Sequence, residues 1–204
     1  YPTFLATQQQ GGFVNSSYNA LQVRAEKRFS RGFTVLSSYT LSKALDEASW
    51  YDSANSWLDP GNRALNKGLA DFDSRQSLVV SWIWETPFFR KARGLRHSVL
   101  GGWTLNGILT LYAGQPVSYD GSAGHWILTD KDNDYSGHSG NDRPDVIGDW
   151  KLSPNRPRSE VIRAWFRRDA FRPNAAGQLG NLGRNVVIGP GSKSVTLGVF
   201  KNFR

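Results

Sequence analysis

The feature that most constrains this chain is a pair of long alternating segments joined by a tight turn, at residues 18–45. In the first arm Leu21, Val23 and Ala25 share one face, and the residues between them carry charged or amide side chains. This period of two is that of a β-strand and does not fit a helix. After the turn at residues 30–32, the second arm alternates between large apolar and small hydroxylated side chains. The stretch therefore predicts a hairpin of two long strands, each with one apolar face.

The hairpin alone leaves two environments open. Each arm has about the ~9–11 residues that a tilted transmembrane strand needs, and Phe29 and Phe33 stand beside the turn, where a membrane interface favours aromatic side chains. Antiparallel sheets of soluble proteins show the same alternation, because one of their faces packs on a core while the other meets water. The remaining segments must decide between a membrane wall and a soluble sheet.

Length and composition narrow the choice. The 204 residues suffice for one soluble domain, and Cys 0 excludes a disulfide framework and thiolate sites. No apolar run approaches the roughly 18 residues of a helical span, so residence in a membrane requires a β-barrel. The absence of methionine and the strand-like run at the last residues lead us to expect a fragment of a longer chain.

Three further segments alternate as the hairpin does. In one of them Leu78 and Val80 share a face with Trp82 and Trp84, and two neighbouring tryptophans on an apolar face resemble the aromatic girdle of a membrane barrel. The predicted strands lie near residues 18–29, 33–43, 75–86, 103–115 and 193–203.

The connections between these strands alternate in length. Short turns alternate with two long connections, residues 44–74 and 116–192, which a compact soluble domain rarely carries. Barrels of the outer membrane have this asymmetry, with short periplasmic turns and longer extracellular loops. The predicted fold class is therefore all-β: an antiparallel transmembrane β-barrel segment of about five long strands, part of a larger barrel.

The net charge of +8 does not indicate a nucleic-acid partner, because the charges are sorted by the ends of the strands. Basic residues gather beside the short turns, at residues 24–31 and 90–96, and acidic residues fill the connection 44–74. We expect the lipid of the outer membrane, and no nucleic acid, among the partners.

Several phrases in this order resemble one family, the TonB-dependent outer-membrane receptors of the Oar-like kind, and specifically the C-terminal part of their barrel. The resemblance covers nearly the whole chain and lies in YNALQVRAEKRFSRGFTVLSSYTLSKALD, GLADFDSRQSLVVSWIWETPF, LGGWTLNGILTLYAGQPVS, RPDVIGDW, AWFRRDAF, GNLGRNVVIGPG and VTLGVFKNFR.

In such receptors a barrel of about 22 strands surrounds a plug domain. The resemblance implies capture of a nutrient or peptide ligand by the extracellular loops, and uptake energised through TonB. By comparison with the family pattern, we expect the plug, the coupling segment and the last closing strands to lie outside these 204 residues. The resemblance also implies that the strand residues on the polar face line the lumen opposite the plug, among them Gln22, Arg24, Glu26, Thr40 and Asn106.

Two other functions remain open from the sequence. The long loops would also suit a surface adhesin or a structural outer-membrane β protein without transport. A soluble β-sandwich that binds carbohydrate requires the apolar faces to pack on each other instead of on lipid.

No enzyme or cofactor is expected, except for one hypothesis of a calcium loop. Asp130, Asp132 and Asp134 place carboxylates at alternate positions, as at the start of an EF-hand loop, with Asp142 as a fourth ligand. Tyr135 stands where that loop requires glycine, so a solvated acidic loop is the alternative. The sequence contains no G-x-S-x-G nucleophile motif, and the three histidines have no metal-ligand spacing.

Aromatic residues in the loops are candidates for ligand binding, because exposed aromatic side chains mark binding surfaces. Long loops also bury their own side chains, and we expect most of these aromatic residues to pack within the loops. The candidates are Trp50, Tyr51, Trp57, Trp126 and Trp150.

Overall fold

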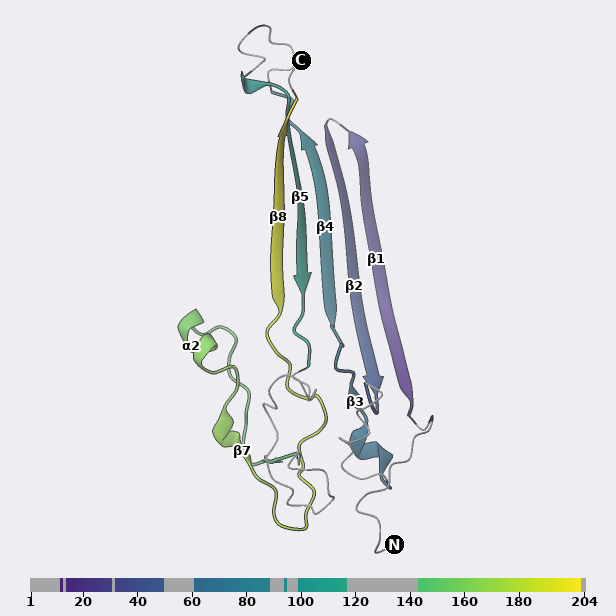
Figure 1. Cartoon of the computed structure of the whole chain (residues 1–204), viewed down its shortest axis with the longest axis vertical. Coiled ribbons are helices and arrows are strands. Elements are labelled where there is room, and N and C mark those ends of the chain that lie inside the picture. The colour runs from purple at the N-terminus through teal and green to yellow at the C-terminus, as the bar shows by residue number, and fades with distance from the viewer. Residues whose placement is uncertain are drawn as a thin grey trace, which may run out of the picture.

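The computed structural model describes residues 12, 14–30, 32–49, 61–88, 94, 99–116 and 143–202. Five long antiparallel strands form one sheet in the order β1-β2-β4-β5-β8, so each long strand pairs with the next along the chain (Figure 1). This arrangement confirms the predicted all-β fold class. The strands are β1 (Ser16–Ser30), β2 (Phe33–Asp46), β4 (Gln76–Glu85), β5 (Trp103–Tyr112) and β8 (Ser192–Lys201).

Smaller elements lie in the long connections. Strand β3 (Gly68–Leu69) pairs with the end of β2, and β6 (Asp145–Val146) pairs with β7 (Phe171–Arg172). Figure 1 places β3, β7 and the helix α2 at the same end of the long sheet. The short helices are η2 (Arg63–Asn66), α2 (Arg158–Arg163) and η3 (Arg168–Ala170). No helix in the described part of the chain is long and apolar enough to cross a membrane.

The register of the long strands gives the sheet an apolar face. In one row of directly opposed residues, Phe33 pairs with Trp84, Trp84 with Leu105, and Leu105 with Val199. The side chains of Leu21, Val23, Val80, Leu109 and Val195 occupy neighbouring rows on this face. Many of them remain exposed in the isolated chain, as a surface that faces lipid requires.

The opposite face of the sheet is predominantly polar. One row runs across all five long strands through Gln22, Thr40, Ser77, Tyr112 and Ser192. The same register places every residue expected to line the lumen on this polar face, because strand residues of one parity share a side.

Two positions in the sheet require glycine, one because of close packing and one because of its backbone conformation. A Cβ atom on Gly107 would lie 2.3 Å from Cζ2 of Trp82, so the tryptophan ring of β4 lies over this position of β5 on the apolar face. At the short turn after β1, Gly32 has a φ of +82°, and its carbonyl accepts a hydrogen bond of 2.7 Å from the amide of Glu85. Only glycine adopts such a backbone without steric cost.

Buried side chains of the described residues gather at the end of the sheet that carries the long connections. The buried apolar residues there include Ala44, Ala70, Leu182 and Val187. The buried polar residues are more unusual, since charged side chains are seldom buried without partners. They are Asp46, Glu47, Asn66, Asp73, Arg143 and Asn174.

Candidate functional site

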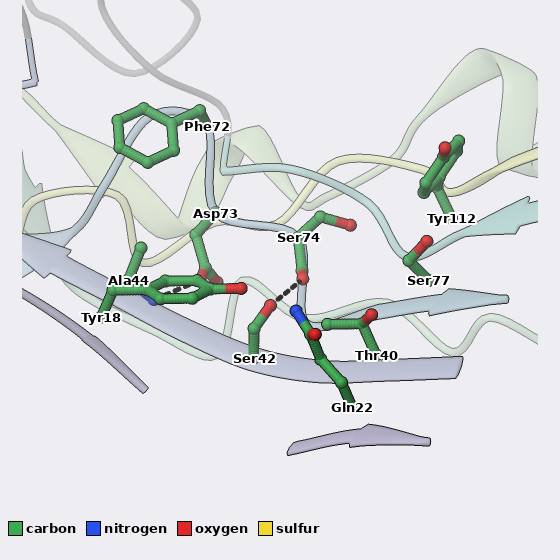
Figure 2. Close-up of a pocket in the computed structure, with 10 residues that line it drawn as sticks. All are labelled: Tyr18, Gln22, Thr40, Ser42, Ala44, Phe72, Asp73, Ser74, Ser77 and Tyr112. Atoms are coloured by element: carbon green, nitrogen blue, oxygen red, sulfur yellow. Dashed lines mark hydrogen bonds between the residues drawn. The ribbon is translucent and has the colours of Figure 1, made fainter. Parts of the chain in front are cut away.

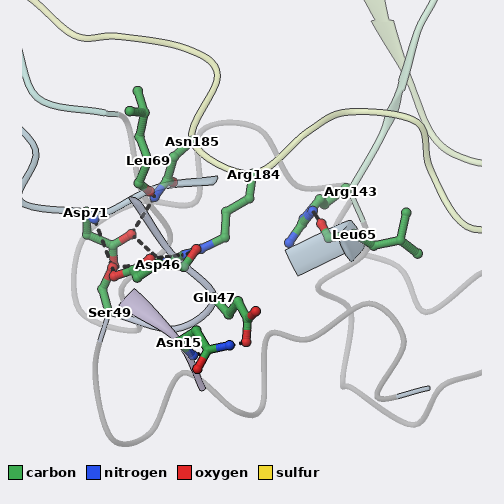
Figure 3. A network of polar contacts seen from close by, with 10 residues as sticks. All are labelled: Asn15, Asp46, Glu47, Ser49, Leu65, Leu69, Asp71, Arg143, Arg184 and Asn185. Atoms are coloured by element: carbon green, nitrogen blue, oxygen red, sulfur yellow. Dashed lines mark hydrogen bonds and ion pairs between the residues drawn. The ribbon is translucent and has the colours of Figure 1, made fainter. Parts of the chain in front are cut away.

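A buried arginine joins the two long connections. The guanidinium of Arg184 forms an ion pair with Oδ1 of Asp46 and donates a hydrogen bond of 3.1 Å to the Asp46 carbonyl (Figure 3). Its other nitrogen donates to Oγ of Ser49 at 2.8 Å and to Oδ1 of Asp71 at 3.2 Å. We call Arg184, Asp46, Ser49 and Asp71 the arginine cluster. It fixes a segment near the end of the second connection to the end of β2.

Neighbouring residues complete the contact of the two connections. Asn185 has a φ of +56°, and its side-chain amide donates to the carbonyl of Leu69 and to Oδ1 of Asp71, both at 2.6 Å. Asparagine tolerates the left-handed region better than most residues. A Cβ atom on Gly68 would lie 2.6 Å from the carbonyl oxygen of Arg184, so the backbones approach closely here.

Another acidic group at this end is Glu47. Its carboxylate forms an ion pair with Arg63 and accepts a hydrogen bond of 3.2 Å from the amide of Asn15. The hydrogen bond from Arg63 is the largest cause that lowers the pKa of Glu47, and burial opposes it. The carboxylate therefore stays ionised at neutral pH and connects the start of β1 to helix η2.

Arg143 carries a buried positive charge beside this cluster. Its guanidinium donates a hydrogen bond of 2.8 Å to the carbonyl of Leu65 (Figure 3). Burial, and then the positive charge of Arg184, lower the pKa of Arg143 to about 10. Arg143 remains charged at neutral pH, and it anchors the second connection where its description resumes at residue 143.

A pocket of about 380 Å³ opens on the polar face next to these anchors. Figure 2 shows Tyr18 and Phe72 on one side of it and Tyr112 on the other, with Thr40 and Gln22 between them. Ala44, Asp73 and the hydroxyl-bearing Ser42, Ser74 and Ser77 complete the lining.

Part of this lining is held rigidly. Oδ1 of Asp73 accepts a hydrogen bond of 2.6 Å from the amide of Ala44, and Oδ2 lies 3.4 Å from Nε of Arg75. The hydroxyl of Ser42 donates to the carbonyl of Ser74 at 2.9 Å. The loop 71–75 is thereby fixed against β2, and the pocket has a wall on its loop side.

A family profile described as an outer membrane beta barrel domain matches residues 1–204, the whole chain. The chain belongs to the outer membrane beta barrel domain family. No curated protein and no solved structure gave a match. The match agrees with the two-faced sheet and places this outer membrane beta barrel domain in the outer membrane.

In barrels of this kind the long connections face the outside. The pocket and the arginine cluster of the outer membrane beta barrel domain therefore lie at its extracellular end. The pocket lies on the lumen side, since its strand residues belong to the polar face.

The predicted site residues fall mostly outside the described part of the domain. This holds for Trp50, Tyr51, Trp57 and Trp126 and for the proposed calcium ligands Asp130, Asp132 and Asp134. Within the described ranges, no group of histidine and acidic side chains is placed to hold a metal ion.

Trp150 is the one loop aromatic candidate that the structure describes. Its ring packs against Phe171 with the centroids 6.4 Å apart, and Phe171 in turn contacts Phe166 edge-on at 5.7 Å. Trp150 also accepts a backbone hydrogen bond of 2.9 Å from Arg167. These contacts form a small aromatic core within the second connection. None of these three aromatic residues is among the residues that line the pocket.

The pocket aromatics of the outer membrane beta barrel domain carry no recognisable signal in the sequence. Tyr18 and Tyr112 lie in strands, where alternation assigns a face but gives no sign of a pocket. Phe72 lies in a connection rich in acidic residues. The sequence indicates only which face of the sheet these strand residues share, because alternation predicts Gln22 and Thr40 on the lumen side.

Proposed function

We propose that this outer membrane beta barrel domain is part of the barrel of a TonB-dependent receptor. In the full-length protein the extracellular loops capture a ligand, and force transmitted by TonB rearranges a plug domain inside the lumen to admit it. The chain contributes wall and loops and no catalytic step. The resemblance of the strand and loop phrases to such receptors supports the proposal.

Large apolar residues on the otherwise polar face carry the proposal. Ile83, Ile108 and Phe200 lie on three adjacent strands, each in a different row of the register, and these residues are 47%, 48% and 56% exposed in the isolated chain. A water-filled channel favours a polar wall. When protein covers large apolar side chains that face the lumen, the free energy falls by about 25 cal/mol per Å² of apolar surface removed from water. These exposed apolar side chains thus support a lumen occupied by a folded domain.

The arrangement at the extracellular end supports ligand capture. The arginine cluster and Glu47 hold the long connections over the strand ends, and the pocket opens between them and the lumen. A receptor needs such preorganised loops, because ordering them during binding would reduce affinity.

The other two functions are weaker. An adhesin or structural protein would use the loops but has no need for large apolar side chains that face the lumen. A soluble β-sandwich needs a second sheet on the apolar face, and the described residues place none there. We therefore propose neither.

Photo-cross-linking tests the proposal in the full-length protein in its own membrane. Benzoylphenylalanine replaces Ile108 on the polar face or, as a matched control, Leu109 on the apolar face of the same strand. We expect the probe at position 108 to cross-link to a plug segment of the same polypeptide, identified by mass spectrometry. The probe at position 109 should give no cross-link to protein within the chain.

The energised step is tested separately, by uptake of a bound ligand with and without an uncoupler of the proton gradient and in cells lacking TonB. Uptake that depends on both supports the receptor. A lumen probe that never cross-links to protein, or uptake that persists without TonB, would contradict it and favour a passive or structural barrel.

A further inference from the structure

We propose that the pocket on the polar face binds a neutral oligosaccharide. The inference rests on the proposed function, because it names the class of ligand that such a receptor would capture at its extracellular end. The described lining of the pocket combines three features that suit this class: a row of uncharged hydrogen-bonding groups, aromatic rings on both sides, and no charged group left without a partner.

The first feature is the row across the strands. Gln22, Thr40, Ser77 and Tyr112 are directly opposed in register, and all four line the pocket. Neighbouring strands are about 4.8 Å apart, so the row offers one amide or hydroxyl group per strand at that spacing. This spacing is close to the length of one pyranose unit. A sugar chain lying across the strands therefore meets a hydrogen-bonding group at each unit.

These groups are available to a ligand. The structure shows no hydrogen bond from the side chains of Gln22, Thr40, Ser77 or Tyr112 to another residue within its described part. Amide and hydroxyl groups both donate and accept hydrogen bonds, as sugar hydroxyls do. A ligand with hydroxyl groups along its length satisfies them without a net charge.

The aromatic rings supply the second kind of contact. Tyr18 and Phe72 lie on one side of the pocket and Tyr112 on the other, and all three side chains are exposed (Figure 2). Tyrosine rings combine an apolar face with a polar tip, which suits a ligand with apolar C–H faces and hydroxyl edges. The apolar faces of pyranose rings fit such surfaces.

The described lining of the pocket favours an uncharged ligand over an ionic one. Among the described residues that line the pocket, Asp73 is the single carboxylate, and Ala44 and Arg75 already engage both of its oxygens. This described lining contains no lysine or arginine. The described lining therefore offers an acidic ligand no cation and a basic ligand no free carboxylate.

A peptide fits less well than a sugar. Peptides often bind by adding a strand to a free sheet edge, where main-chain groups supply the affinity. Strands β2, β4 and β5 each pair on both sides, so their backbone groups are used within the sheet. Only side chains remain to bind a ligand across this row.

Calorimetric titration of the full-length protein in detergent tests the inference without any energised step. The probes are neutral linear hexasaccharides of glucose, xylose, mannose and galactose in α and β linkage, together with an uncharged hexapeptide. The pocket variants are Tyr112→Phe and Thr40→Val, each of which removes one hydroxyl group. The matched control is Tyr39→Phe, because Tyr39 neighbours Thr40 on the same strand but lies on the apolar face.

We expect at least one hexasaccharide to bind, with Kd raised roughly 2- to 10-fold by each pocket variant and unchanged by Tyr39→Phe. Folding of the variants is checked by heat-modifiable gel mobility. Failure of every sugar to bind, equal binding by pocket and control variants, or binding of the peptide alone with the same dependence on Tyr112 would overturn the inference. Tyr112-dependent sugar binding without TonB-dependent uptake would instead contradict the proposed function and leave the pocket assignment intact.

Discussion

Replacing Arg184 with leucine should release the second connection from the end of the sheet. The side chains of Arg184, Asp46 and Asp71 are only 11%, 6% and 10% exposed. Removing one partner of a buried ion pair leaves an uncompensated buried charge and costs about 3–5 kcal/mol. Here two carboxylates lose their cation at once. Because 1.36 kcal/mol is a factor of ten, local opening should become roughly a hundredfold to several thousandfold more frequent.

Hydrogen exchange with mass spectrometry measures this opening in the full-length protein in detergent. The amide of Asp71, which donates to Oγ of Ser49 at 2.9 Å, should lose its protection in Arg184→Leu. The ladders of β4 and β5 should keep theirs, because their hydrogen bonds do not involve the arginine cluster. A triple variant that also carries Asp46→Asn and Asp71→Asn should recover much of the protection, since no buried charge is left unpaired.

Arg172→Leu is the matched control. Arg172 also pairs with a carboxylate, Asp145 at 3.6 Å, but its side chain is 64% exposed. Exposed pairs contribute about 0–1 kcal/mol, so this variant should change exchange by less than about tenfold. If Arg184→Leu exchanged no faster than Arg172→Leu, the reasoning about the buried cluster would be refuted.

Three other predictions concern single residues. Because the pKa of Glu47 is lowered in the folded protein, the ionised carboxylate stabilises the fold above pH 4.5, and this stabilisation is lost as the pH falls through the folded-state pKa. Glu47→Gln should therefore reduce the increase in hydrogen exchange that acid causes in this loop. Gly107→Ala should lower the free energy of unfolding in urea by about 1–3 kcal/mol through overlap with Trp82, and Trp82→Leu should relieve it; an equal effect in both backgrounds would contradict this contact. Val80→Arg on the apolar face should cost about 2–4 kcal/mol in a bilayer, whereas Ser81→Arg on the polar face should cost much less, and similar costs would argue against lipid on one face.

The barrel wall was predictable because its determinants are local. Alternation at Leu21, Val23 and Ala25 assigns a face within a few residues, and the observed register gives the same assignment. The ends of strands were less predictable: the strand expected over residues 103–115 ends at Tyr112, and that expected over 18–29 extends over Ser16–Ser30. Hydrogen bonding to neighbouring strands determines where each strand ends. The residue pattern of a single strand carries no information about that pairing.

The loop end could not be predicted, because its contacts join distant segments. Arg184 and Asp46 are 138 residues apart in sequence, and neither belongs to a motif that predicts their contact. Close approach of two backbones is a further long-range requirement, because a Cβ atom on Gly180 would overlap the carbonyl oxygen of Arg143. Long-range packing of this kind leaves little local pattern.

One face of the sheet meets lipid and the other faces the lumen. The 204 residues contain no cysteine, so single cysteines can be placed at Ser77, Leu78, Val79 and Val80, in a full-length protein from which any cysteine outside these residues has been removed, and labelled with a fluorophore. In liposomes of brominated lipid, labels at positions 78 and 80 should be quenched and those at 77 and 79 should not. Quenching without alternation, or with the opposite alternation, would contradict the account.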